Sequence, residues 1–279
     1  MTTTNRRPAD VSEKKARQVA EAARESEWRK PSFGKELFLG RFRLDLIDPP
    51  PAAEPPTDFF TELESFLRTE VDGARIEQDA HIPDEVFRGL ARLGAFGMKI
   101  DKEYGGLGLT NLQYCKALTL IGSVSSALGA LLSAHQSIGV PQPVKMFGTA
   151  EQKQRFLPRC ARTDISAFLL TEPDVGSDPA RLATTATPSE DGKSYVLNGQ
   201  KLWTTNGVVA GLLVVMARVP RSEGHRGGIT AFIVEGDAPG VTVEHRNAFM
   251  GLRGIENGVT RLDQVTVPVE NRIGAEGAG

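Results

Sequence analysis

The segment Phe168–Asp178, FLLTEPDVGSD, decides how this sequence is interpreted. It begins as an apolar run and ends in a polar loop, in which Pro173 fixes one φ angle and Gly176 permits a close backbone approach or a positive φ. Such a loop can present amide and hydroxyl groups to a heterocycle or a phosphate. Taken alone, however, an ordinary structural turn explains the segment more simply.

A second informative segment begins 29 residues after the first, at Leu197–Gly207, LNGQKLWTTNG. Trp203 stands two residues before Thr205, so a large ring lies close to a hydroxyl donor. This pair could flank a flat cofactor, with the indole on the ring face and the hydroxyl against a ring nitrogen. For this piece alone, a core tryptophan beside a solvent-facing threonine is again the simpler explanation.

The sequence around these two segments indicates β-structure. Asn198-Gly199 is a strong hairpin signal because both residues accept positive φ, and it separates the β-prone runs 194–197 and 201–204. Further apolar or alternating runs, bounded by turn residues, occupy 212–217, 229–235, 241–245 and 259–267. We therefore expect a compact antiparallel β-domain after Ile165, built as a barrel or a sandwich.

The preceding hundred residues have helical periodicity. Apolar residues recur at three-to-four spacing from Phe59 to Leu67, and Pro83 is placed to open a second helix. The apolar stretch Leu112–Ile138 predicts a helix buried on most sides. We expect residues 151–157 to form a short amphipathic helix that Pro158 stops, and residues 103–109, EYGGLGL, to form a loop.

These patterns predict an α+β protein in three parts. Residues 1–56 form a charged arm, an apolar docking segment and a proline-rich linker, DPPPAAEPP, at 48–56. Residues 57–165 form an all-α domain, and residues 166–279 form the β-domain. Within the arm, residues 10–30 carry charge on every side and are expected to be a solvated helix or a partly disordered segment.

The composition excludes several classes of function. The net charge is −2 and the pI is about 6.2, which gives no basic footprint for nucleic acid. Cys115 and Cys160 form neither a disulfide framework nor a metal-ligand pattern, so no metal site is expected. No apolar run is long enough for a membrane span, and the first residues resemble neither a signal nor a transit peptide. A cytoplasmic location is expected.

Together, the two opening segments resemble the acyl-CoA dehydrogenase family. Further segments match the family in order and spacing: residues 103–108 (EYGGLG), 147–158 (FGTAEQKQRFLP), 228–240 (GITAFIVEGDAPG), 250–254 (MGLRG) and 265–271 (VTVPVEN). The resemblance covers roughly residues 58–279. The motif AHQSIG at 134–139, Phe168 and the segment 32–42 are most similar to the very-long-chain branch.

The resemblance implies FAD as cofactor. It implies that Thr171 binds the pyrimidine end of the flavin, that Trp203 packs against the ring system, and that Thr205 donates toward N5, the hydride acceptor. Ser177 would contact both flavin and acyl-CoA. The full set of cofactor-binding residues implied in this way is Phe168, Leu170, Thr171, Gly176, Ser177, Trp203, Thr204 and Thr205.

The family reaction is α,β-dehydrogenation of an acyl-CoA thioester to a trans-2-enoyl-CoA, a step of fatty-acid β-oxidation. A carboxylate removes the Cα proton, and the electrons pass to an electron-transfer flavoprotein. By resemblance, that base lies in a C-terminal four-helix bundle, which the sequence does not reach before Gly279. The catalytic residue is therefore unknown. Glu172, Glu235, Glu244 and Glu256 match neither of the family's base positions.

Some features leave alternatives open. The same bundle supplies most of the family's subunit interface, so a homo-oligomer is expected of a complete protein. A flavin oxidase or hydroxylase of the same fold, and a non-catalytic subunit that keeps the fold, are the alternative functions. Residues 254–257, GIEN, depart from the family's more polar version, which puts contacts there in doubt. Asp174-Val175 replaces the small residues common between the proline and the glycine of the loop.

Overall fold

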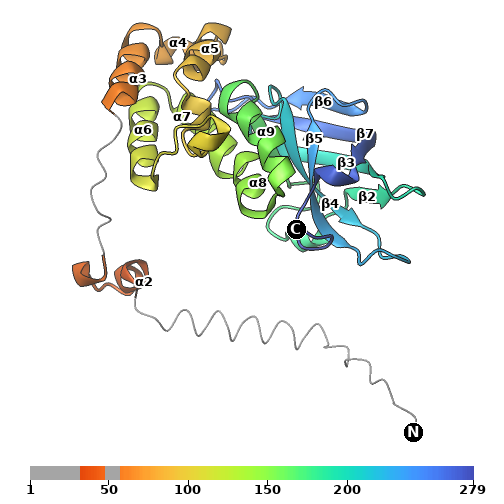
Figure 1. Ribbon diagram of the computed structural model, residues 1–279. Coiled ribbons are helices and arrows are strands. Elements are labelled where there is room, and N and C mark those ends of the chain that lie inside the picture. The colour runs from red at the N-terminus through yellow and green to blue at the C-terminus, as the bar shows by residue number, and fades with distance from the viewer. Residues whose placement is uncertain (1–31, 48–56) are drawn as a thin grey trace. The chain divides into compact units, whose positions relative to one another are not determined.

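The computed structural model describes residues 32–47 and 57–279 (Figure 1). The chain divides into two units, Met1–Ala52 and Ala53–Gly279. The expectations for residues 10–30 and for the linker 48–56 concern residues outside the described part. The three-part division at residues 56 and 165 stays a prediction, because residues 57–279 pack as one unit that contains both helices and strands.

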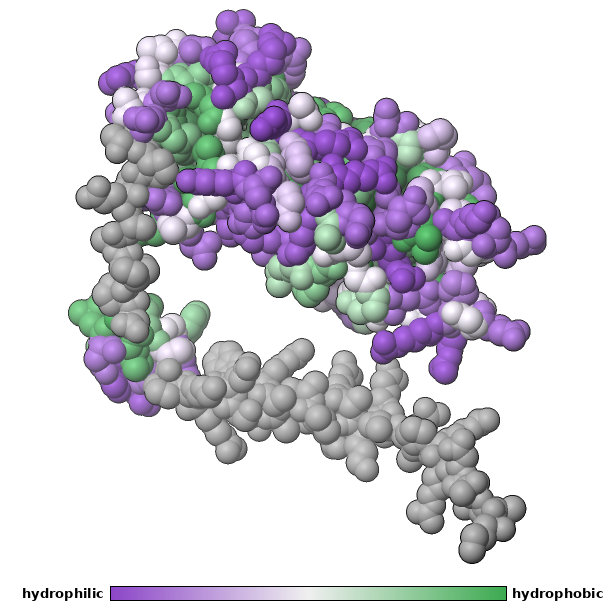
Figure 2. All heavy atoms as spheres, in the orientation of Figure 1, coloured by the Kyte–Doolittle hydropathy of each residue, from purple (hydrophilic) through white to green (hydrophobic). Residues whose placement is uncertain are grey.

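In the first unit, the described residues form a short amphipathic turn of helix. Helix α2 (Phe33–Phe38) begins at Ser32, whose hydroxyl accepts a hydrogen bond from the Lys35 amide, and the 3-10 helix η1 (Leu44–Leu46) follows. The apolar side chains here are largely exposed, with Phe38 95% exposed (Figure 2). Docking by this segment stays a prediction.

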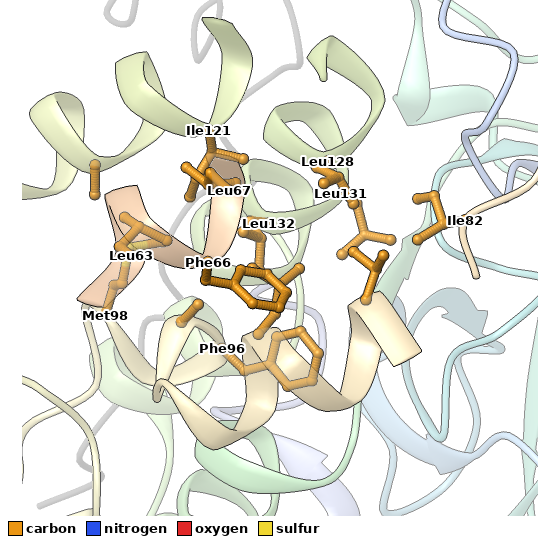
Figure 3. Packing of buried hydrophobic residues seen from close by; sticks show 14 of the residues in the cluster. Leu63, Phe66, Leu67, Ile82, Phe96, Met98, Ile121, Leu128, Leu131 and Leu132 are labelled. Atoms are coloured by element: carbon orange, nitrogen blue, oxygen red, sulfur yellow. The ribbon is translucent and has the colours of Figure 1, made fainter. Parts of the chain in front are cut away.

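The first half of the second unit is helical, as predicted. It contains α3 (Thr57–Thr69), α4 (Gly73–Asp79), α5 (Asp84–Arg92), η2 (Ala95–Gly97), η3 (Lys102–Tyr104), α6 (Asn111–Val124) and α7 (Ser126–Ser137). Pro83 caps the start of α5. Of the loop expected at 103–109, residues 103 and 104 belong to η3, and residues 105–109 form the loop. The apolar face of α3, with Leu63, Phe66 and Leu67, packs against α6 and α7 in one core (Figure 3).

The predicted long helix 112–138 is two helices, so that prediction was wrong. Ser125 has extended backbone angles, φ −148 and ψ 113, and its hydroxyl caps α7 by accepting from the Leu128 amide. Its own amide donates to the carbonyl of Ile121 and closes α6. The break contains neither glycine nor proline, and a serine can both end one helix and begin the next, because its side chain replaces a missing backbone partner.

Helices α8 (Pro141–Phe147) and α9 (Ala150–Arg162) follow, and the second one corrects another prediction. Pro158 lies inside α9 and does not stop it. The turn after the proline carries Cys160 and Ala161, both buried in the core between α8, α9 and the sheet. Burial of this last turn offsets the hydrogen bond that Pro158 removes.

The second half is one eight-stranded, mostly antiparallel sheet. Its strands are β1 (Ser166–Leu169), β2 (Thr185–Pro188), β3 (Ser194–Thr204), β4 (Leu212–Val219), β5 (Gly228–Glu235), β6 (Val241–Arg246), β7 (Gly258–Pro268) and β8 (Arg272–Ile273). The order is β6-β7-β3-β2-β4-β5-β8, and β1 pairs with β4. The two pairings that β1 and β2 make with β4 are parallel, which departs from a purely antiparallel domain.

Strand β4 has two buried faces, which explains why its sequence is a continuous apolar run. Leu213 and Val215 face a core that they share with residues of β3 and β7, so the sheet curls around these side chains. Leu212 and Val214 face the opposite way, toward Phe156 and the other buried residues of α9. In this way α9 is fixed on the outer face of the sheet (Figure 1).

The predicted hairpin at Asn198-Gly199 is absent, because β3 continues through both residues. The pairing of β3 with β7 shifts register between Leu197 and Gly199, so the two residues form an irregularity within a strand. Asn198 Oδ1 accepts the Gln264 amide at 2.8 Å, and a side chain at Gly199 would collide with Thr184. Pairing with β7 therefore overrides the local turn preference.

Candidate functional site

The two informative segments lie side by side in the structure. The amide of Leu202 donates to the carbonyl of Thr171 at 2.8 Å, which joins the end of β3 to the loop that follows β1. Reciprocal hydrogen bonds between the backbones of Glu172 and Val175 fold that loop into a tight turn. Thr171 and Trp203 are thereby held on neighbouring stretches of backbone, although 32 positions separate them in sequence.

A buried ion pair stabilises the contact between the loop after β1 and the end of β3. Lys201 Nζ lies 2.7 Å from Glu172 Oε1 and donates to the carbonyl of Leu170 at 3.1 Å, and both charged side chains are buried. The carboxylate of Glu172 also accepts the amides of Ala183 and Thr184, at 2.6 and 3.0 Å. The sequence did not reveal Lys201 as part of the site, because its partner lies 29 residues earlier.

The pair sets the ionisation of both groups. Burial lowers the pKa of Lys201 to about 8, against the raising effect of Glu172. Burial by itself raises the pKa of Glu172, but the hydrogen bonds from Lys201, Thr184 and Ala183 outweigh it and hold that pKa below its usual value. Glu172 is therefore an ionised anchor of the loop.

Trp203 is held in a strained and exposed position. Its φ is +54, a region that bulky residues rarely occupy and that costs roughly 1–3 kcal/mol. The register of β3 against β7 shifts again between Lys201 and Thr204, and such irregularities turn a side chain away from its regular direction. The residue is 58% exposed, and its ring centroid lies 6.3 Å from that of Phe249.

Thr205 is tied to a pair of buried asparagines. Its Oγ1 accepts a hydrogen bond from Asn257 Nδ2 at 3.2 Å, and Asn257 Oδ1 accepts from Asn247 Nδ2 at 2.7 Å. The backbones of the two asparagines are also joined, by the Asn247 amide and the Asn257 carbonyl at 2.8 Å. The segment 254–257, which departs from the family pattern, thus reaches the candidate site through Asn257.

The remaining predicted residues divide into two groups. Gly176 and Ser177 are exposed in the loop, and a Cβ added at Gly176 would meet no atom within 4 Å. Phe168 and Leu170 are half-buried and pack against the core beneath α9. Thr204 is buried, and its hydroxyl has no hydrogen-bond partner among the described residues.

The four glutamates that the sequence analysis considered each have a cationic partner. Glu172 is paired with Lys201, Glu235 with Arg159, Glu244 with Arg261 and Glu256 with Arg246. Hydrogen bonds from Arg261 and Gln200 lower the pKa of Glu244. A general base for Cα deprotonation needs a pKa raised toward neutrality, so pairing of this kind is unsuited to that role.

The motif AHQSIG has a structural role. His135 Nδ1 accepts the Ser166 amide at 3.0 Å, and Nε2 lies 3.0 Å from the Cys160 carbonyl, to which it must donate. This arrangement requires the neutral ring with its proton on Nε2, and burial lowers the pKa of His135 to about 4. The motif therefore joins α7 to the start of β1 and to α9.

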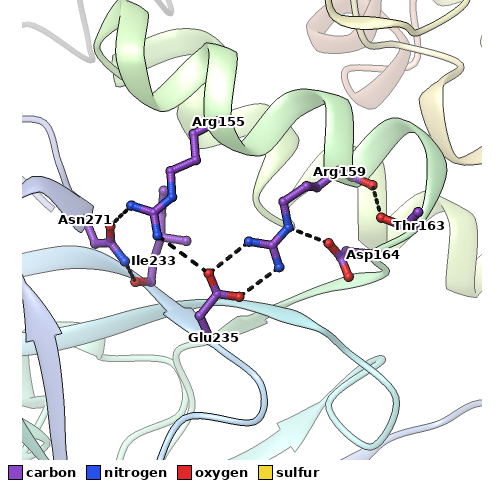
Figure 4. A network of polar contacts seen from close by, with 7 residues as sticks. All are labelled: Arg155, Arg159, Thr163, Asp164, Ile233, Glu235 and Asn271. Carbon is purple, nitrogen blue, oxygen red and sulfur yellow. Dashed lines mark hydrogen bonds and ion pairs between the residues drawn. The ribbon is translucent and has the colours of Figure 1, made fainter.

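A second polar network joins α9 to β5 (Figure 4). Arg159 binds Glu235 through two hydrogen bonds of 2.9 and 2.8 Å, and its Nε donates to Asp164 at 2.7 Å. Arg155 reaches Glu235 only at 3.9 Å and bonds Asn271 at 3.3 Å. The network holds the last helix of the α-half against the sheet that carries the candidate site.

The arrangement suits a flat, partly polar ligand. The indole of Trp203 is exposed at a position of strained backbone, and Thr205, two residues later, carries a hydroxyl on a half-buried side chain. Thr171 and Ser177 make no side-chain hydrogen bond with other described residues, so their hydroxyls are free to bind a ligand, and Gly176 leaves open space next to them. These are features of a site for an aromatic heterocycle with hydrogen-bonding edges.

Neither a membrane-spanning helix nor a metal-binding cluster is found in residues 32–47 and 57–279. In that part of the chain, no helix has the length and apolar character that crossing a bilayer requires. No group of three or more His, Cys, Asp or Glu side chains is arranged to hold a metal ion there.

A helical half packed on a curled sheet, with a candidate heterocycle site where β3 ends, defines an α+β protein of two layers. Comparison with known families gives the particular family. Residues 57–164 match the acyl-CoA dehydrogenase N-terminal domain, and residues 167–265 match the acyl-CoA dehydrogenase middle domain. The chain belongs to the acyl-CoA dehydrogenase family.

Individual relatives agree with this assignment. The chain is 66% identical over 274 residues to the probable acyl-CoA dehydrogenase FadE10 of Mycobacterium tuberculosis, covering 96% of this chain and 42% of that protein. It is 38% identical to the very long-chain specific acyl-CoA dehydrogenase of Macaca fascicularis, over 89% of this chain and 39% of that one. The chain therefore spans well under half the length of these relatives.

A solved structure supports the fold. The acyl-CoA dehydrogenase from Bacillus anthracis, complexed with FAD, superposes with a TM-score of 0.73 at 30% identity, covering 85% of this chain and 41% of that one. The predicted fold class, helices followed by a mostly antiparallel β-domain, is confirmed.

Proposed function

We propose that this protein is an FAD-dependent acyl-CoA dehydrogenase that converts an acyl-CoA thioester to a trans-2-enoyl-CoA. The observation that carries the proposal is the junction of Thr171 with the strained, exposed Trp203. Backbone strain at an exposed aromatic residue is expected where the ring binds a ligand. The FAD-bound relative and the family assignment support a flavin as the heterocycle.

The chain's residues take these roles in the proposal. Trp203 packs against the flavin ring, Thr171 binds its pyrimidine end, and Thr205 donates to N5. Bound FAD supplies the hydride acceptor. Ser177, on the open loop, contacts the acyl-CoA. Fixed donors at the edges of a flavin tune its electronics and are already oriented when charge develops, which is the main contribution that a protein makes to such chemistry.

The Cα proton requires a carboxylate that we do not assign to any residue of this chain. The pairing of Glu172, Glu235, Glu244 and Glu256 with cations supports that choice. The electrons pass to an electron-transfer flavoprotein in this proposal, and the complete protein is a cytoplasmic homo-oligomer in the fatty-acid β-oxidation pathway. Each of these properties is proposed from the family assignment.

Anaerobic titration of the FAD-loaded complete protein with acyl-CoA tests the proposal, because the 279 residues alone, with no assigned base, are expected to be inactive. Palmitoyl-CoA and butyryl-CoA are added separately, and loss of the visible flavin absorbance is followed together with formation of the enoyl-CoA. Stoichiometric bleaching with one of them, and turnover with an electron-transfer flavoprotein, is expected. Turnover that consumes oxygen equally fast would favour the oxidase alternative. Retained FAD that no acyl-CoA reduces would contradict the proposal.

A further inference from the structure

A short chain of amide hydrogen bonds ends at Thr205. Asn257 is 4% exposed and Asn247 is 9% exposed, so neither amide can exchange its partner freely with solvent. Asn257 Oδ1 accepts from Asn247 Nδ2 at 2.7 Å, which leaves Nδ2 as the group of Asn257 that faces Thr205 Oγ1 at 3.2 Å. An amide nitrogen can only donate, so Thr205 must accept.

This contact determines what the hydroxyl can do next. A threonine hydroxyl has one hydrogen and two acceptor sites. With one acceptor site filled by Asn257, the hydrogen is directed away from the buried amides. No other hydrogen bond of Thr205 Oγ1 is formed within residues 57–279, and the side chain is half-buried two positions after Trp203. The hydroxyl hydrogen is therefore left available for donation to a ligand.

We infer that Asn257 is a positioning residue that fixes the Thr205 hydroxyl as a hydrogen-bond donor to the bound flavin. The inference rests on the proposed function, because it assigns a direction to a contact that the function requires. Asn257 would act by preorganisation: the hydroxyl does not have to reorient when the cofactor binds.

Asn257→Asp is the sharpest variant for a test. It keeps the shape of the side chain and can still accept from Asn247 Nδ2. An ionised carboxylate cannot donate, however, so it would instead accept the Thr205 hydrogen and turn the hydroxyl away from the flavin. Because the new charge also acts on the flavin directly, Asn257→Asp is combined with Thr205→Val in a double-mutant cycle, which removes the direct effect.

The experiment measures the dissociation constant of oxidised FAD for the wild type, both single variants and the double variant. Oxidised N5 is an acceptor, so Thr205→Val should weaken binding about fivefold in the wild type, as expected for one lost hydrogen bond. In the Asn257→Asp background it should have little further effect. Thr205→Val should shift the visible spectrum of the bound flavin when it is introduced into the wild type. The same substitution should leave the spectrum unchanged when it is introduced into the Asn257→Asp variant.

Asn257→Ala serves as the second variant, since it frees the hydroxyl without adding charge and should give an intermediate Thr205→Val effect. Thermal unfolding of each variant shows that the fold is kept. If the wild type binds FAD but Thr205→Val weakens FAD binding equally in all backgrounds, the positioning role of Asn257 is overturned. The proposed function is not affected by that result. A wild type that binds no FAD would overturn the proposed function and this inference with it.

Discussion

The ammonium of Lys201 lies 2.7 Å from the carboxylate of Glu172, and the two side chains are 0% and 4% exposed. One comes from β3, next to Trp203, and the other from the loop that begins at Thr171. A buried charge without its partner is strongly unfavourable, so each residue requires the other to be in place. The pair therefore couples the two segments of the candidate site.

Removing one member of this pair should be costly. Lys201→Met leaves Glu172 buried without its cation, and a loss of about 3–5 kcal/mol in the free energy of unfolding is expected. The double variant Lys201→Met/Glu172→Gln should lose clearly less than the sum of the single losses, because neither charge is left alone. Urea unfolding of the three variants measures these energies. Additive losses would show that the pair does not couple the segments.

His135 should make stability depend on pH. Burial lowers its pKa from 6.5 to about 4, so between these values the unfolded chain binds a proton that the folded protein does not. Its contribution is complete above pH 6.5 and is lost as the pH falls toward 4. The expected loss in unfolding free energy reaches about 3 kcal/mol.

Urea unfolding at a series of pH values between 7 and 4 measures this effect. His135→Gln keeps a donor for the Cys160 carbonyl and should flatten the profile. His245→Gln, at an exposed histidine of β6, is the matched control and should leave the profile as in the wild type. The same acid-induced loss in His135→Gln as in the wild type would contradict the assignment of the effect to His135.

Arg159 should stabilise the attachment of α9 to the sheet. Lysine cannot reproduce its two parallel hydrogen bonds to Glu235, so Arg159→Lys is expected to lose about 1–2 kcal/mol. Arg155→Lys is the control, since Arg155 approaches Glu235 only to 3.9 Å and should lose less. Thermal or urea unfolding compares the two. An equal effect of both substitutions would contradict the importance of the bidentate geometry.

Trp203 should contribute to flavin affinity through its exposed ring face. Trp203→Ala is expected to weaken FAD binding by about 1–3 kcal/mol, from the lost stacking and burial. It should also relieve the strain of the positive φ only in part, because alanine is disfavoured there as well. Phe147→Ala on α8, where the ring is 63% exposed, is the control for loss of an exposed aromatic side chain. Equal dissociation constants for both variants would rule out a stacking role.

The sequence predicted elements well where burial alone determined their pattern. Strands β4, β5 and β7 were located to within two residues, because their apolar runs reflect packing on one or both faces. The predictions failed where distant pairing decided the outcome. At Asn198-Gly199, a local hairpin preference was overridden by the partner strand β7, and at Ser125 the helix break depends on a side-chain cap that carries no glycine or proline signal.

The candidate site shows the same division. The resemblance identified Thr171, Trp203 and Thr205, and the structure brings their segments together. The groups that hold them were not predictable from the sequence: Lys201 finds its partner 29 residues away, and Asn257 meets Thr205 across 52. A buried lysine and a buried amide look like ordinary surface residues until the chain is folded, because their burial is set by long-range contacts.

The central claim, that Trp203 and the Thr171 loop hold a flavin, can be tested most directly through Trp203 fluorescence. The sequence contains two tryptophans, so Trp28→Phe leaves Trp203 as the sole tryptophan emitter. FAD is titrated into this variant while bound flavin is measured independently by equilibrium dialysis. We predict that Trp203 emission is quenched in proportion to bound FAD and saturates at one FAD per chain. Bound FAD with unchanged Trp203 emission, or no bound FAD, would contradict the account.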